Sequence, residues 1–377
     1  MTRARRALRS RGAAALASAL ALTATAALAH HEITAKFDDT KHATLTGVVT
    51  DVDWRNPHVH VFINVTGDAG SVANWAIELE STIALVKSGW RADTLKPGDR
   101  VTVAGITARD GTRQIWGESV TETATARKVL YWVDTAPAAP AKARPAPRGP
   151  DGHPRLGALD TEGGYWGYPT ATVLVQDGAQ VAQNAHGLLA NPKDAARVAP
   201  LQPWALALYQ RRQERQLRDD PMFLNCKPPG GVRYLQSEYG IQLVEDRERQ
   251  RIFVLIGGGN HNYRIIYLDG RTNRGQVRGD DDNPLYYGRG TGHWDGDTLV
   301  VETTGFNEDF WFTNGGLPHT NLLHLTERFS RPDFETLRYE VTIEDPGAYT
   351  KPWSAHWDLR WIGGEELPTF FCQDNRS

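Results

Sequence analysis

A proline- and alanine-rich stretch divides this chain into two parts. The stretch from Asp134 to Arg155 reads DTAPAAPAKARPAPRGPDGHPR. Alternating Pro and Ala without apolar periodicity cannot bury a core, so we expect an extended, semi-rigid linker over 134–155. The flanking parts, about 100 and about 220 residues long, each suit one ordinary domain. The sequence therefore predicts two domains, over 30–133 and 156–377.

The first 29 residues predict export as a signal peptide. Five arginines precede an uncharged Ala/Leu-rich stretch, which ends in the small-x-small cleavage site Ala27-Leu28-Ala29. Cleavage after Ala29 makes His30 the first residue of the mature chain. A second small-x-small site, Ala24-Thr25-Ala26, would instead leave His30 inside the chain. In either case we expect a periplasmic or secreted protein.

Charge and composition argue against two classes of partner. The formal charge is −3, and loss of the signal arginines makes the mature chain more acidic, whereas nucleic-acid binding needs a basic surface. Beyond the signal, no stretch is long and apolar enough to span a bilayer, so we expect no stable membrane insertion.

The two cysteines, Cys226 and Cys372, predict one disulfide in an exported protein.

The first domain has the pattern of a small OB-like β-barrel. Its segments alternate apolar and polar residues with the period of two that is typical of half-buried strands. A short helix is predicted over Thr82–Trp90, between the third and fourth strands, which is the OB order. The predicted strands are Ala43–Val52, His58–Val65, Asn74–Glu80, Arg100–Ile106 and Gln114–Val120.

The second domain is also predicted to be mainly β. One helix is expected from about Gln202 to Arg218, with Pro203 in its first turn. Many short strands after it indicate a larger antiparallel, lipocalin-like barrel or a sandwich. These strands are expected at Val232–Ser237, Ile241–Glu245, Arg251–Ile256, Tyr263–Leu268, Thr298–Thr304, Leu322–Arg328, Thr336–Ile343, Ser354–Ile362 and Thr369–Cys372.

Four histidines in the first domain predict a metal site. A terminal His30 offers its α-amine and its imidazole to one ion, and His31 follows it. His58 and His60 share one face of a strand, so both can reach the same ion. A planar nitrogen set suits Cu(II), so copper is the expected cofactor. The alternative is that these are a frayed chain start and ordinary surface histidines.

The first domain resembles a family of secreted bacterial proteins of uncharacterised function. The resemblance rests on His30-His31, Phe37-Asp38, Leu45-Thr46-Gly47 and Trp54-Arg55-Asn56-Pro57-His58. The second domain is similar to a segment of many exported soil-bacterial proteins, also without an assigned activity. That similarity rests on Cys226-Lys227-Pro228-Pro229-Gly230, Gly296-Asp297-Thr298-Leu299-Val300-Val301, Pro318-His319 and Thr326-Glu327-Arg328. Both resemblances imply export and a β architecture, and neither implies a reaction.

Glu327 is the candidate acid/base of the second domain. It shares a strand face with Leu323, Leu325 and Phe329, so it is expected among apolar groups. Burial raises the pKa of a carboxyl group unless a cation pairs with it, which is the setting of a general acid or base. His319 or His324 would assist it in a hydrolase or lyase. The alternative is a structural Glu–Arg pair.

Three tryptophans predict either a core or a ligand cavity. Trp353, Trp357 and Trp361 lie on one face of a strand. Such a stripe usually belongs to a core, but inside a barrel it can line a cavity for a flat or sugar-like molecule. The sequence therefore predicts an exported protein that binds a metal and a small-molecule ligand, with a periplasmic hydrolase or lyase as the alternative.

Overall fold

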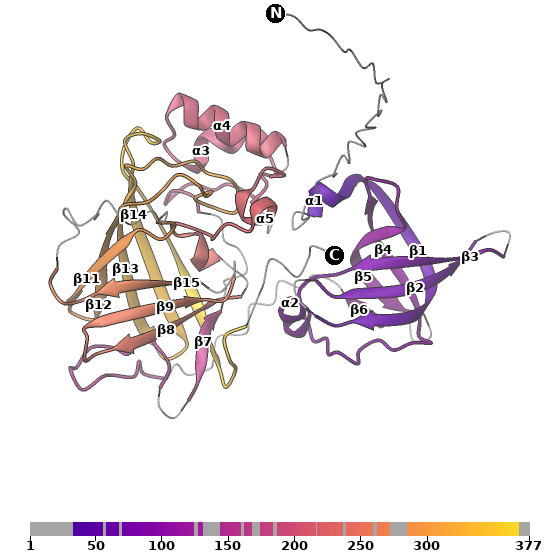
Figure 1. Cartoon of the computed structure of the whole chain (residues 1–377), viewed down its shortest axis with the longest axis horizontal. Helices are drawn as coiled ribbons and strands as arrows, with labels where there is room; N and C mark the ends of the chain where they lie inside the picture. The colour runs from indigo at the N-terminus through magenta and orange to yellow at the C-terminus, as the bar shows by residue number, and fades with distance from the viewer. Residues whose placement is uncertain are drawn as a thin grey trace, which may run out of the picture.

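The computed structural model contains two β-barrels, drawn in indigo to purple and in magenta to yellow (Figure 1). It describes residues 33–55, 58–67, 70–123, 127–130, 144–159, 162–167, 174–183, 187–215, 217–236, 239–258, 262–271 and 285–368. The predicted signal peptide, His30, His31 and the first part of the predicted linker lie outside these residues. Within them, no helix has both the length and the apolar character needed to cross a membrane.

The first barrel is a ring of five strands. It runs in the order β1-β2-β3-β5-β4, and β4 pairs with β1 to close it. All neighbours are antiparallel except β3 and β5, which are parallel. Its elements are α1 (Ile33–Lys36), β1 (Phe37–Asp53), β2 (His60–Thr66), β3 (Val72–Glu78), α2 (Thr82–Lys87), β4 (Arg100–Ala108) and β5 (Gln114–Glu122), and β6 (Arg127–Leu130) adds to β5. This ring, with α2 between β3 and β4, confirms the OB-like prediction.

Alternation along the strands builds the core of this ring. Val61 and Ile63 of β2 are fully buried, whereas His60 and Phe62, which alternate with them along the strand, are only half-buried. The inward residues join a cluster that includes Val103. A separate small cluster packs Phe37, at the start of β1, against side chains of β4 and β5. The beginning of the described chain is therefore held on the barrel.

The second barrel is a closed ring of nine strands. Its order is β10-β11-β12-β13-β14-β15-β7-β8-β9. The strands are β7 (Gly164–Gly167), β8 (Ile241–Asp246), β9 (Arg251–Ile256), β10 (Asn262–Tyr267), β11 (Arg289–Asp295), β12 (Thr298–Thr304), β13 (His324–Asp333), β14 (Thr336–Glu344) and β15 (Trp353–Gly363). Closure confirms the predicted barrel.

The barrel is mixed rather than wholly antiparallel, which corrects the prediction. Strands β10 and β11 run parallel, with Ile266 opposite Gly290. Parallel neighbours need a long crossover connection, whereas a tight hairpin forces an antiparallel pair. Residues 268–288 provide a connection long enough for the parallel arrangement.

Short helices gather over one end of the second barrel (Figure 1). They are η1 (Pro192–Asp194), α3 (Ala195–Val198), α4 (Pro203–Glu214), α5 (Pro221–Asn225) and η2 (Arg233–Gln236). The predicted helix over 202–218 is therefore present but shorter. The strand predicted at 232–237 is wrong, because η2 occupies this place. A buried ion pair between Arg233 and Asp220, the N-cap residue of α5, holds η2 against the start of this helix, in place of strand pairing.

The second half of the predicted linker belongs to the second barrel. The Arg144 guanidinium lies 3.5 Å from the centre of the Phe334 ring and pairs with Glu335. Four residues later, Arg148 pairs with Asp297. Residues from 144 onward therefore pack on the barrel rather than form a spacer.

The predicted disulfide and the last predicted strand involve the end of the chain. Cys226 follows α5 within the described residues, whereas Cys372 and the strand predicted at 369–372 lie outside them. The disulfide and this strand therefore stay predictions.

Candidate functional site

Two histidines and one carboxylate meet on the first barrel. His60 begins β2 and lies opposite Glu78, the last residue of β3, in the antiparallel register. The Nδ1 atom of His58 lies 2.6 Å from Glu78 Oε1, and the Nε2 atom of His60 lies 3.6 Å from Glu78 Oε2. The structure therefore brings His58 and His60 together, as their spacing predicts, and adds Glu78 between them.

The start of the described chain reaches the same carboxylate. Lys36 ends α1, and its Nζ atom lies 2.6 Å from Glu78 Oε2. The backbone here is fixed, because Arg109 N donates to the carbonyl of Lys36 and Phe37 packs on Trp116. Ile33 packs on the same cluster. The three residues from Ile33 back to His30 span at most about 11 Å.

Glu78 is ionised in this setting. Burial alone would raise its pKa, but the hydrogen bond with His58, the nearby His60 ring and the charge of Lys36 outweigh burial and hold this pKa well below its usual range. The His58 ring also packs edge-on against the indole of Trp116, with 5.2 Å between ring centres. The group is thus a fixed carboxylate with positively polarised neighbours on both oxygens.

The described part of this group is incomplete as a metal centre. No three His, Cys, Asp or Glu side chains of the described residues are placed to hold a metal ion. His58 and His60 supply imidazole nitrogens, and the other two predicted ligands, His30 and His31, lie outside the described residues. A copper centre of the predicted kind therefore needs the N-terminal residues.

Sequence reasoning missed Glu78 and Lys36. Glu78 is the last residue of an apolar strand, and from the sequence pattern alone an acidic residue at a strand end is expected to face solvent. Its meeting with His60 depends on the register between two strands, which periodicity alone does not specify. Lys36 belongs to a short helix that precedes every predicted strand.

Glu327 lies inside the second barrel, where both of its carboxylate oxygens accept hydrogen bonds from neighbouring side chains. It is fully buried and forms two hydrogen bonds with Arg264, of 2.9 and 2.7 Å. Thr303 and Tyr339 donate their hydroxyls to it at 2.6 and 2.9 Å, and Tyr234 accepts from Arg264. This is the structural Glu–Arg pair that the sequence left open as the alternative.

The two histidines proposed to assist Glu327 lie elsewhere. His324 faces outward from β13, and its Nε2 atom lies 2.6 Å from Glu302 Oε2. His319 lies in the preceding loop, where its ring stacks on Phe310 at 4.1 Å and Nε2 lies 3.1 Å from the Phe310 carbonyl oxygen. Burial lowers the pKa of His319. The structure does not assemble these three side chains into one site.

The three tryptophans separate into two environments. Trp353 and Trp361 are buried in the core, where Trp361 contacts Trp166 edge-on at 5.0 Å. Trp357 is only partly buried and contacts Tyr339 at 4.8 Å. It also lines a hollow of about 510 Å³ on β14 and β15.

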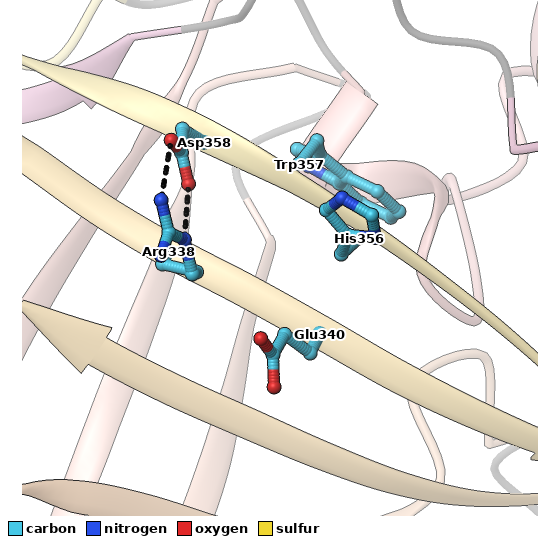
Figure 2. A pocket seen from close by; sticks show the side chains of 5 residues that line it. All are labelled: Arg338, Glu340, His356, Trp357 and Asp358. Carbon is cyan, nitrogen blue, oxygen red and sulfur yellow. Dashed lines mark hydrogen bonds and ion pairs between the residues drawn. The ribbon is translucent and has the colours of Figure 1, made fainter. Parts of the chain in front are cut away.

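Charged side chains form most of this hollow (Figure 2). Arg338 and Asp358 face each other across β14 and β15 through two hydrogen bonds, of 3.0 and 3.3 Å. Glu340 and His356 lie beside them, opposite each other in the register. His356 Nδ1 also lies 2.7 Å from Asp177 Oδ1. The hollow therefore offers both charges, an imidazole and an indole to a polar molecule.

Comparison with known proteins finds a family match for most of the first barrel. Residues 17–116 match a family of unknown function, DUF6152. The matched segment contains His30, His31, His58, His60 and Glu78, and a further β-rich region follows it. No curated protein matches the chain.

Proposed function

We propose that this is an exported metal- and small-molecule-binding protein whose first barrel binds Cu(II) at the mature N-terminus. The observation that carries the proposal is the convergence of His58 and His60 on Glu78, beside the anchored Lys36. Cleavage after Ala29 would start the chain at His30, within about 11 Å of Ile33. His30 then supplies an amine and an imidazole, His58 or His60 supplies a further imidazole, and His31 lies next to them.

The metal fits the donor set. Three or four nitrogen donors, one of them a terminal amine, suit the tetragonal geometry of Cu(II) better than that of other common biological divalent ions. Export matches this chemistry, because the amine exists only after removal of the signal peptide.

The terminal amine provides the direct test. We would titrate Cu(II) by calorimetry into protein that starts at His30 and into protein with one extra Met before it. The proposal expects clearly weaker binding in the extended protein and in His58→Ala. The control is His42→Ala, which removes an exposed histidine of the same barrel. Equal affinity in all four proteins would remove the terminal-amine site.

The hollow on β14 and β15 supports the small-molecule part of the proposal. Trp357, Arg338 and Glu340 offer a ring face and both charges to a polar organic ligand. A thermal-shift screen identifies ligands, because a bound ligand raises the melting temperature by mass action. Trp357→Ala should abolish the shift, and Trp204→Ala, an exposed tryptophan outside the hollow, should retain it.

The hydrolase or lyase alternative has weaker support. Glu327 is already bound by Arg264, Thr303 and Tyr339, and neither predicted histidine reaches it. An enzyme of this kind would lose about 10²–10⁴ in rate in Glu327→Gln.

A further inference from the structure

We propose that Glu78 is the positioning residue of the metal site, and that it directs the Nε2 atom of His58 to the metal by accepting a hydrogen bond from Nδ1. This inference rests on the proposed function. It assigns unequal roles to the two barrel histidines, which the sequence treats alike.

The chemistry of the pair fixes the proton on His58. Glu78 already accepts from the Lys36 ammonium group at 2.6 Å, and a carboxylate paired in this way only accepts hydrogen bonds, so we assign Nδ1, at 2.6 Å from Glu78 Oε1, as the donor. In the neutral imidazole the lone pair then belongs to Nε2, the other ring nitrogen. Metal-bound histidines in proteins are commonly oriented by a carboxylate in this way.

The surroundings hold the pair in place. The His58 side chain is 16% exposed and its ring packs on Trp116. The Glu78 side chain is 7% exposed, and its position at the end of β3 is set by the pairing of β3 with β2. Both partners are therefore preorganised, which is what an orienting hydrogen bond requires.

The two oxygens of Glu78 have different partners. Oε1 accepts from His58, whereas Oε2 lies 2.6 Å from Lys36 Nζ and 3.6 Å from His60 Nε2. The second of these distances is too long for a hydrogen bond. Glu78 therefore orients His58 strongly and His60 weakly, and Lys36 compensates its charge at the other oxygen, Oε2.

Lys36 provides a matched control for Glu78. Glu78→Gln removes the charge and leaves an amide that can turn its NH₂ group toward Nδ1, so the Nδ1–H tautomer loses its preference. Lys36→Met removes the other main partner of Glu78 and leaves the His58 contact in place. Glu78→Asp retains a carboxylate and should restore part of the wild-type behaviour.

The first experiment needs no metal. Nitrogen-15 NMR of the ring nitrogens in metal-free protein starting at His30 should show His58 protonated at Nδ1. The same state is expected in Lys36→Met, and a shift toward Nε2–H is expected in Glu78→Gln. A wild-type His58 protonated at Nε2 would overturn the inference, whatever the protein binds.

The second experiment is Cu(II) titration with electron paramagnetic resonance spectra. Glu78→Gln should bind Cu(II) about 10–100-fold more weakly than wild type, with an altered spectrum. Lys36→Met should bind no more weakly than wild type, because it removes a positive charge. If wild type binds Cu(II) and Glu78→Gln matches its affinity and spectrum, the role of Glu78 is wrong. If wild type does not bind Cu(II), the proposed function fails instead.

Discussion

At the scale of single residues, the two barrels place a buried glutamate in opposite situations. Glu327 has Arg264, Thr303 and Tyr339 around it and no exposed surface. Glu78 is bound by His58 and by Lys36, whose side chain is 24% exposed, so its surroundings continue to the protein surface. The first arrangement serves structure. In the second, one partner of the carboxylate reaches the solvent.

The Arg264–Glu327 pair should be needed for stability. Glu327→Gln would leave the buried charge of Arg264 without compensation, and breaking such a pair costs about 3–5 kcal/mol. Urea denaturation should show this loss in the free energy of unfolding. The double variant Arg264→Met with Glu327→Gln should lose less than the sum of the two single variants. A loss below about 1 kcal/mol in Glu327→Gln would show that this glutamate is not a structural anchor.

His319 should make the second barrel sensitive to mild acid. Burial lowers its pKa below the ordinary value of 6.5, so the folded protein holds a neutral imidazole. Unfolding then takes up a proton below pH 6.5, and stability should fall as pH drops from 6.5 toward the folded pKa. The slope is at most about 1.4 kcal/mol per pH unit.

Urea denaturation between pH 8 and pH 5 measures this effect. His319→Gln should flatten the profile below pH 6.5, whereas His356→Gln, which replaces an exposed imidazole, should keep the wild-type slope. If His319→Gln retains the wild-type dependence of stability on pH, groups other than His319 cause the acid sensitivity.

At the scale of elements, the cap of helix α2 is a sharp test of local structure. Ser81 is fully buried, and its hydroxyl accepts from Ala84 N at 3.2 Å. Ser81→Ala should destabilise the first barrel by about 1 kcal/mol, because it leaves an N–H of the first turn without its partner. Ser88→Ala, at the exposed end of the same helix, should cost less. Chemical denaturation followed by fluorescence compares the two, and equal losses would contradict the role of the cap.

Strands with clear alternation were predictable, and glycine-rich strands were not. The strands predicted at 100–106, 298–304 and 336–343 correspond to β4, β12 and β14. By contrast, β7 reads GYWG and β11 reads RGTGHWD, and glycine lowers strand propensity in both. In β11 the glycines face neighbouring side chains at close range, since a Cβ on Gly290 would lie 2.9 Å from Arg264 Nη2. Tertiary packing therefore selects these strands.

The candidate site was predictable only in part, for a similar reason. The spacing of His58 and His60 predicts that both side chains lie on one face of a strand, and in the structure both approach the carboxylate of Glu78. The third member, Glu78, comes from another strand, so it needed the register of the sheet. For Glu327 the strand pattern indicated burial correctly, but its cation, Arg264, lies far away in the sequence.

At the scale of the whole molecule, we expect two independent unfolding transitions. Each barrel has its own cluster of buried apolar side chains. Calorimetry of protein starting at His30 should therefore resolve two peaks. Cu(II) at about 100 times its dissociation constant should stabilise the first barrel by about 2.7 kcal/mol. The transition of the second barrel should stay unchanged, and a single transition that moves as a whole would contradict this independence.

The parallel seam of each barrel follows from simple parity. Strand direction can alternate all the way round a ring only when the number of strands is even, and these rings have five and nine strands. Each must contain a parallel neighbour pair, which is β3–β5 in one ring and β10–β11 in the other. Evolutionary gain or loss of a whole hairpin changes the number of strands by two, so the ring keeps an odd number of strands and its parallel neighbour pair. A descendant that lost one strand could close by alternation alone, and the crossover at 268–288 would then be free to shorten into a hairpin.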